Sequence, residues 1–356
     1  MTKVKYMAVL ILVAIAGCFA CKSPQTKGAL EIWYGDIQRV GHLGIAQEDF
    51  NLLGHVEPWR EIDQFGWRLN NEVYPTPVSF RSFRRLARDG DFNIDIPVGR
   101  LKPDTNLVKL KVSFLNGDVL EREIMVLREE GSRELPLVIQ WDSVDHLQDA
   151  CQVVDGKWAL EKEGPRVVQE GYDRIILIGE TGWQNYEVHT SITVHEVFKS
   201  LEPSDGGGAV GILMHFTGHT TGGPQHFPSG QPKWGYQPFG GITWLRWERG
   251  KESNPPESRF YPGIGWKETT FGELADFQAG KTYEIRSACN TPPDEHGEGA
   301  VLYSFKIWDT HAPEPEAWDW QHKQVSEHAL TSGGLALIAH HVDATFGDVE
   351  ITGDSP

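Results

Sequence analysis

Short runs that alternate apolar and polar residues are the feature that most constrains how this chain can fold. Alternation with a period of two, in β-branched and aromatic residues, is typical of half-buried strands. It is clear at residues 107–114, 186–194 and 283–288. No stretch after residue 28 repeats apolar residues at the helical spacing for three turns, and 38 glycines and 21 prolines provide turns between the runs. The sequence therefore predicts an all-β chain.

The first residues have the features of a signal peptide. Two lysines precede the uncharged apolar run Met7–Ala16, which is shorter than the about 20 residues that cross a bilayer. Residues 15–18, Ile-Ala-Gly-Cys, resemble the bacterial lipobox. The resemblance implies that Cys18 is lipidated, with Cys21 as the alternative, and that residues 1–27 supply signal, anchor and tether for a protein of the bacterial cell envelope, anchored in the outer membrane. A cleaved signal peptide with two incidental cysteines is the other interpretation.

A charged stretch without apolar residues, Arg128–Glu134, divides the rest of the chain. Residues 28–130 have the length and strand spacing of an immunoglobulin-like sandwich, with a hairpin turn predicted at the Asn-Gly pair 116–117. The block Trp33–Val56 resembles the start of immunoglobulin-like modules. Residues 131–356 contain enough strands for a two-sheet jelly roll.

Four segments follow one another near the C-terminus: a strand with a tryptophan, an acidic Pro-Glu loop, a strand led by Gly-Gly and a final Phe-Gly-Asp-Val strand. They are Leu302–Trp308, Pro313–Glu316, Gly333–His340 and Thr345–Ile351. In this order they resemble the concanavalin A-like, laminin-G-like sandwich. The resemblance implies a lectin-like or glycan-processing role, because that superfamily contains carbohydrate-binding modules, glycoside hydrolases and polysaccharide lyases. The fold alone does not select among these activities.

Aromatic residues gather in this part of the chain, since 9 of the 13 tryptophans follow residue 150. Flat aromatic faces stack on sugar rings while polar neighbours bind the hydroxyl groups. Trp234 and Tyr236 lie among turn residues, and strand alternation places Trp244 and Arg246 on one face, opposite Trp247. One tryptophan of this strand should then line a groove and the other should be in the core, although core packing is the alternative for each.

Three histidines, His215, His219 and His226, occur close together. A helix would align the first two as metal ligands, but the glycines and the proline at 218–224 exclude a helix. On a strand, His215 would share the groove face with Leu213 and contact a sugar; a metal site and ordinary surface histidines are the alternatives. The predicted ligand-binding residues are His215, Trp234, Tyr236, Trp244 and Arg246, and the candidate catalytic residues are His215 and His219.

The carboxylates give little support for catalysis. Glycoside hydrolysis needs two carboxylates that face one bond, and concanavalin A-like glucanases carry them on one strand. No strand here has that pattern, and Glu314 and Glu316 are typical of solvated loop charges. The sequence also lacks the Gln-Ile-His of alginate lyases and a Gly-x-Ser-x-Gly elbow. It therefore leaves open whether the protein is an enzyme.

Acidic residues outnumber basic ones, 50 to 33, for a formal charge of −17. The only basic cluster is the short run from Arg81 to Arg88. Because phosphate binding needs concentrated positive charge, nucleic acid is not expected as a partner, and a polysaccharide that is not strongly anionic fits better.

Two more features concern cross-links and metals. Cys151 and Cys289 could pair in an oxidising periplasm, and two buried free thiols are the alternative. Concanavalin A-like sandwiches often hold a structural calcium through Asp side chains, so the resemblance makes Asp348 a candidate ligand; an aspartate at a strand edge is the alternative. No other cofactor is expected.

The first hypothesis is therefore a glycan-binding lipoprotein in which the N-terminal module is a spacer or docking platform and the jelly roll carries the groove. The second is a glycan-degrading hydrolase or lyase that uses His215 or His219 with a nearby acid in the same groove. The third is an adhesion or assembly protein that binds another protein.

Overall fold

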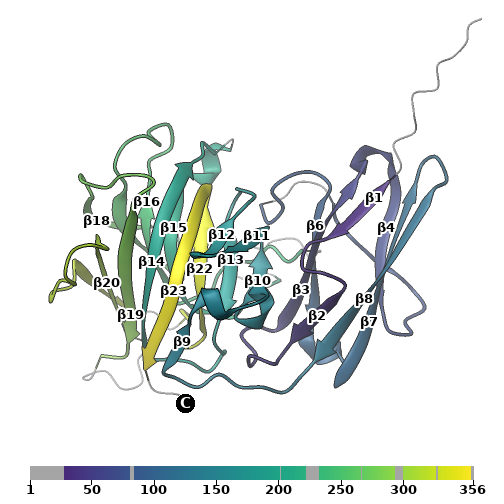
Figure 1. Cartoon of the computed structure of the whole chain (residues 1–356), viewed down its shortest axis with the longest axis horizontal. Helices are drawn as coiled ribbons and strands as arrows, with labels where there is room; N and C mark the ends of the chain where they lie inside the picture. The colour runs from purple at the N-terminus through teal and green to yellow at the C-terminus, as the bar shows by residue number, and fades with distance from the viewer. Residues whose placement is uncertain are drawn as a thin grey trace, which may run out of the picture.

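Two β-sandwiches lie side by side in the computed structural model, which describes residues 28–80, 84–200, 202–221, 232–265, 267–292, 300–325 and 328–353 (Figure 1). These residues form 23 strands and five short 3₁₀ helices, so the all-β prediction is confirmed. Within them, no helix is long and apolar enough to cross a membrane. The predicted anchor cysteines, Cys18 and Cys21, and the histidine His226 lie outside the described residues.

The N-terminal sandwich has a three-stranded and a five-stranded sheet. The first has the order β1 (Ala29–Ile32), β3 (Asp49–Glu57), β6 (Asp91–Pro97). The second has the order β2 (Ile37–Val40), β8 (Val119–Arg128), β7 (Asp104–Phe114), β4 (Ile62–Leu69), β5 (Thr76–Pro77). Its assignment to the immunoglobulin-like modules stays a prediction.

Alternation explains how the five-stranded sheet forms its core. In β7, Val108, Leu110 and Val112 are buried, while Lys109 and Lys111 between them point to solvent. The Asn-Gly pair turns the chain from β7 into β8, and Gly117 adopts φ 89°, a conformation that glycine tolerates best. The hairpin prediction is confirmed.

The C-terminal sandwich stacks a seven-stranded sheet on an eight-stranded one, and all its strand pairs are antiparallel. The seven-stranded sheet has the order β10 (Gln152–Asp155), β13 (Arg174–Ile178), β22 (Gly334–His340), β15 (Ala209–Phe216), β16 (Gly241–Arg246), β17 (Glu257–Pro262), β18 (Thr269–Glu273). The other has the order β11 (Trp158–Glu161), β12 (Gly164–Val167), β23 (Val342–Gly353), β14 (Tyr186–Val197), β19 (Thr282–Asn290), β20 (Ala300–Asp309), β21 (Trp320–Val325), with β9 (Leu137–Ile139) against β23.

The seven-stranded sheet is buried on both faces at its centre. One face packs on the other sheet in a core that contains Trp183, Ile212 and Phe305. The opposite face carries a second apolar cluster that includes Phe216 and Phe239. This explains why β15 and β22 are fully buried along their whole length, as continuous apolar strands are.

The pairing of Cys151 with Cys289 is wrong, and the alternative, two buried free thiols, is confirmed. Cys151 and Cys289 are both buried free thiols, and each donates to a main-chain carbonyl, of Leu147 and Gln184 respectively, at 3.3 Å. Cys151 directly precedes β10, whereas Cys289 contacts His215 of β15. Since β13 and β22 lie between β10 and β15, the two thiols sit in different parts of the same core.

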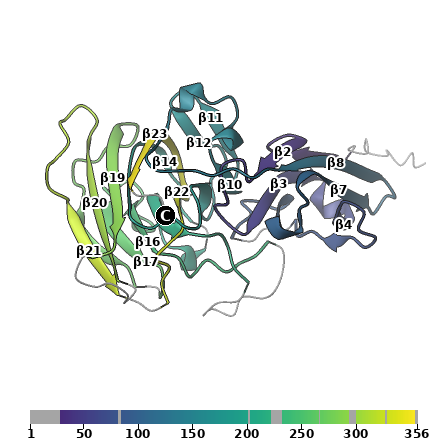
Figure 2. The same ribbon diagram turned by 90° about the horizontal axis from the view of Figure 1, so that it is seen from below.

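The three-stranded sheet faces the C-terminal sandwich, and β3 lies next to β10 (Figure 2). Leu52 of β3 belongs to the N-terminal core, while its neighbour Leu53 belongs to the C-terminal core. The predicted boundary, Arg128–Glu134, begins at the last residue of β8 and continues into the connection from β8 to β9. The contact between the sandwiches is therefore made by a sheet face and not only by the connecting segment.

Candidate functional site: a cleft between the sandwiches

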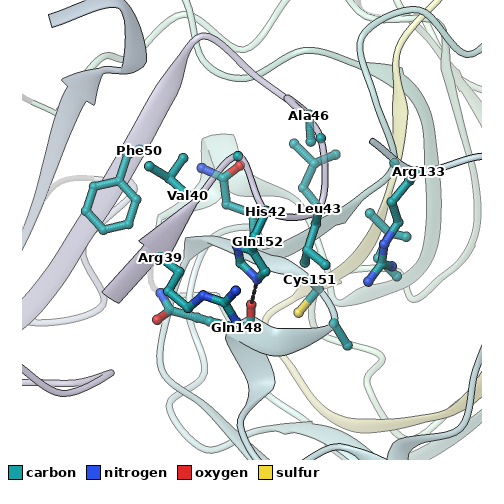
Figure 3. Close-up of a pocket in the computed structure, with 16 residues that line it drawn as sticks. Arg39, Val40, His42, Leu43, Ala46, Phe50, Arg133, Gln148, Cys151 and Gln152 are labelled. Carbon is teal, nitrogen blue, oxygen red and sulfur yellow. Dashed lines mark hydrogen bonds between the residues drawn. The ribbon is translucent and has the colours of Figure 1, made fainter. Parts of the chain in front are cut away.

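Hollows of about 30, 460, 500 and 650 Å³ lie between the sandwiches. The one drawn in Figure 3 lies beside His42, whose Nε2 is 3.0 Å from the carbonyl oxygen of Gln148. Its volume is about 30 Å³, which suffices for little more than one water molecule. The second is a cleft of about 460 Å³, within the range of small-molecule sites.

The cleft opens on the face of the seven-stranded sheet that is turned away from the other sheet. Its floor comes from β16, β17 and β22, its walls from segments of both sandwiches. The lining includes Arg84, Arg85, Asp155, Tyr172, Asp173, Asp205, His219, Trp234, Tyr236, Trp244, Arg246, Tyr261, Glu268 and His340. Four of the five predicted ligand-binding residues are therefore brought together there.

Strand β16 behaves as its alternation predicts. Trp244 and Arg246 line the cleft, whereas Leu245 and the following Trp247 pack in the core between the sheets. The guanidinium of Arg246 lies over the Trp244 ring, 4.8 Å from its centroid, and the Trp244 and Tyr261 rings are 5.9 Å apart.

The placement of His215 in the groove is wrong. The strand has a bulge at this residue, whose φ of 53° turns its side chain to the inner face of the sheet and leaves Phe216 on the cleft side. Its Nε2 is 2.7 Å from the carbonyl oxygen of Gln184, and its ring packs against Tyr186. Because the side chain is 1% exposed, burial lowers the pKa of His215 to about 4.

The other candidate histidine, His219, does line the cleft, but both of its ring nitrogens are occupied. Nε2 is 2.6 Å from Oδ2 of the buried Asp155, and Nδ1 is 3.3 Å from the carbonyl oxygen of Gly235. A general base must reach the substrate with a free nitrogen. This geometry favours a structural role for His219.

His340 is held in a similar way. Its Nδ1 is 2.7 Å from Asp173 Oδ1, and its Nε2 is 2.8 Å from the carbonyl oxygen of Asp205. Burial lowers the pKa of His340, although Asp173 acts in the opposite direction.

Each arginine of the cleft faces a carboxylate. Arg85 bonds Asp155 at 2.7 Å, Arg84 Nη2 is 3.3 Å from Asp205, and Arg246 Nε is 3.4 Å from Glu268. Burial alone would raise the pKa of Asp155, but Arg85 and His219 hold that pKa below its ordinary value. Three arginines against four carboxylates make the lining close to neutral in formal charge.

Three buried polar atoms of the cleft residues have no hydrogen-bond partner in the described part of the chain: Trp244 Nε1, Tyr236 Oη and Glu268 Oε1. Burial raises the pKa of Tyr236 well above its ordinary value, so its hydroxyl stays protonated and can donate. Two donors and one acceptor beside aromatic rings can bind the hydroxyl groups of a neutral ligand.

The calcium candidate lies elsewhere. Asp348 is on β23, where its Oδ1 accepts a hydrogen bond from the Trp141 main-chain N–H at 3.0 Å. Among the described residues, no group of three or more metal-ligating side chains is found. A calcium ion at Asp348 stays a prediction.

Several residues that line the cleft were not predicted as site residues from the sequence, above all Arg84, Arg85, Tyr172 and Tyr261. The run Arg81–Arg88 was the one available signal, because it is the chain's only basic cluster. The composition of this run indicated neither a cleft nor the carboxylates that pair with its arginines, because those carboxylates lie far along the chain.

No family model matches the chain, and no curated protein matches it. Among solved structures it is similar to the exoplasmic/lumenal domain of VIP36 in its Ca²⁺/Man3GlcNAc-bound form (12% identity, 56% of this chain and 83% of that chain, TM-score 0.32). It is also similar to an alginate lyase Aly36B mutant in complex with alginate trisaccharide (12% identity, 62% and 98%, TM-score 0.35). The endo-β-1,4-mannanase from Thermotoga petrophila matches over 30% of this chain and only 20% of its own, at 9% identity and TM-score 0.23. At these identities and TM-scores, the likeness carries no argument about activity.

Proposed function

We propose that the protein is an envelope-anchored lipoprotein whose cleft binds a neutral saccharide. The observation that carries the proposal is a set of three polar atoms, on Trp244, Tyr236 and Glu268, that have no partner among the described residues, in a cleft whose charged groups are otherwise matched. A saccharide hydroxyl both donates and accepts, and the faces of its ring are apolar, so it suits such a set. The concanavalin A-like resemblance of the C-terminal sandwich supports the same class of ligand.

Binding is favoured over catalysis because the cleft's two histidines, His219 and His340, have both ring nitrogens occupied. An anionic glycan fits less well, since the arginines already face carboxylates and the chain is strongly acidic. The site therefore suits a neutral chain end or a short segment of a neutral polysaccharide.

The test uses the mature protein without its lipid in affinity gels that contain galactomannan, xyloglucan, laminarin, alginate or polygalacturonate. We expect retardation by at least one neutral polysaccharide, none by the two anionic ones, and no release of reducing ends in parallel. Trp234→Ala should abolish the retardation. Trp59→Ala, which changes a partly buried tryptophan of the N-terminal sandwich outside the cleft, should not. Release of reducing ends, or binding only to the anionic polymers, would refute the proposal.

The anchor part of the proposal is tested separately. The lipobox resemblance predicts that cells fed radiolabelled palmitate label the full-length protein and that Cys18→Ser removes the label, whereas Cys21→Ser keeps it. If only Cys21→Ser removes the label, Cys21 is the lipidated residue instead of Cys18.

A further inference from the structure

We infer that the N-terminal sandwich is part of the saccharide site and that Asp95 is a positioning residue for the segment that carries Trp234 and Tyr236. The inference rests on the proposed function, which it deepens. It replaces the expectation that this sandwich serves as a spacer.

The carrying segment is tied to the N-terminal sandwich at Lys233, next to Trp234. The main-chain N–H of Lys233 donates to Asp95 Oδ2 at 2.6 Å, and its carbonyl oxygen accepts from Arg85 Nη1 at 3.0 Å. Its ammonium group pairs with Asp49. The main-chain N–H, the main-chain carbonyl and the side chain of Lys233 are thus all bonded to the N-terminal sandwich. The position of this part of the cleft wall therefore depends on that sandwich.

Asp95 occupies the centre of these contacts without itself lining the cleft. Its Oδ1 accepts from Arg85 at 2.9 Å and from Asn51 at 2.7 Å, so its two oxygens face three different donor groups. The residue is 2% exposed. A buried carboxylate with this many donors has a fixed orientation, and it fixes its donors in turn.

Arg85 extends the network into the C-terminal sandwich. It is 6% exposed and bridges Asp95 of β6 to Asp155 of β10, which in turn bonds the cleft residue His219. Asn93 adds a second link between the sandwiches, 3.0 Å from Asp155 Oδ1. These polar contacts between the two sandwiches and the polar contacts behind the cleft thus form one continuous network.

The neighbouring Arg84 reaches the cleft directly. Its guanidinium lies over the Tyr172 ring, 4.8 Å from the centroid, and pairs with Asp205 at 3.3 Å. The N-terminal sandwich therefore supplies both a wall residue and the support of the aromatic segment.

The experiment compares three full-length mature variants in the gels described above. Asp95→Asn keeps the shape of the side chain but replaces one acceptor oxygen with an amide group that donates. This group must then face another donor, either the Lys233 N–H or the side chains of Arg85 and Asn51. Asp49→Asn weakens only the tie to the Lys233 ammonium. Gln148→Ala, the matched control, removes a contact between the sandwiches away from the cleft, to Gln38 at 3.2 Å.

We expect affinity for the retarding neutral polysaccharide to fall at least tenfold in Asp95→Asn, about threefold in Asp49→Asn and not at all in Gln148→Ala. In protein labelled with 5-fluorotryptophan, the ¹⁹F resonance of Trp234, assigned through Trp234→Phe, should shift in the two aspartate variants and stay in place in Gln148→Ala. This second readout needs no ligand, and a general loss of stability would not move one resonance selectively.

The outcomes separate the two proposals. If the unmutated protein binds no polysaccharide, the proposed function fails, and an unmoved Trp234 resonance would overturn the positioning role as well. If the unmutated protein binds and Asp95→Asn binds equally with an unmoved resonance, the positioning role is wrong while the function stands. If Asp95→Asn does not fold, Asp49→Asn decides by the same two readouts.

Discussion

The proposed saccharide binding depends on individual polar atoms that have no partner in the described part of the chain. Tyr236 Oη and Trp244 Nε1 are buried without a partner in the described structure, although most buried polar groups in proteins are paired. An unpaired buried hydroxyl costs roughly 1–3 kcal/mol, which a ligand that pairs it restores on binding. Each such atom therefore lowers the stability of the free protein and raises its affinity for the right ligand.

Tyr236→Phe should separate these two effects. Because no partner is lost, we expect the free energy of unfolding in urea to stay unchanged or rise by about 1 kcal/mol. Saccharide affinity, measured by calorimetric titration, should fall about five- to tenfold, as the loss of one hydrogen bond predicts.

Tyr186→Phe is the matched control for this prediction. The Tyr186 hydroxyl donates to the Gly334 carbonyl at 3.2 Å and accepts from the His215 N–H at 2.9 Å, so its removal should destabilise the fold. Equal destabilisation by the two substitutions would mean that Tyr236 Oη is paired after all.

His215 predicts a pH dependence of stability. Its pKa of about 4 in the folded protein lies below the ordinary 6.5 because the ring is buried, so the unfolded chain binds its proton first as the pH falls. The stability that this residue contributes is complete above pH 6.5 and is lost between pH 6.5 and 4, by roughly 3 kcal/mol.

The measurement is the free energy of unfolding at several pH values between 7 and 4.5. His215→Gln should remove this part of the slope, whereas the same change at the exposed His146 should leave it. A slope that is identical in His215→Gln and in the unmutated protein would contradict the assignment.

At the scale of elements, the packing of β15 against β16 sets the position of the cleft floor. Gly211 of β15 pairs with Trp244 of β16. A Cβ atom at Gly211 would lie 2.2 Å from the Thr243 carbonyl oxygen and 2.6 Å from Trp244 Cα. The absence of a side chain at this position therefore lets the two strands hold Trp244 where it lines the cleft.

Gly211→Ala should thus destabilise the protein by about 1–3 kcal/mol, the usual effect of overpacking, and also weaken saccharide binding by moving Trp244. Denaturation and calorimetric titration measure the two effects. Gly272→Ala, on β18 of the same sheet, is the control, because an added Cβ meets no atom within 4 Å there. Unchanged binding in a clearly destabilised Gly211→Ala would show that Trp244 does not contribute to the site.

At the scale of the whole molecule, buried charges join the two sandwiches. Arg85 lies between Asp95 and Asp155, and all three residues are at most 6% exposed. Removing one member of such a set leaves the others buried and unpaired, which is far more costly than losing a surface ion pair.

We therefore expect Arg85→Ala to lower stability by about 3–5 kcal/mol and to split one calorimetric unfolding transition into two, one for each sandwich. Glu31→Gln breaks the exposed bridge to Lys157, 2.7 Å long, which also joins the sandwiches. It should cost less than about 1 kcal/mol and keep a single transition. Similar effects of both substitutions would contradict a dominant role for the buried network.

The Asn-Gly pair by itself determined the hairpin at 116–117. Local alternation by itself determined the all-β class and the opposite directions of Trp244 and Trp247, because strand side chains alternate between faces. The same rule misplaced His215, since a bulge shifts the alternation by one residue and depends on the neighbouring strands rather than on the residue itself. The cleft was decided only by tertiary structure. Arg85 meets Asp155 across 70 positions of sequence, and the packing of two sandwiches that brings them together leaves no periodic signal in either segment.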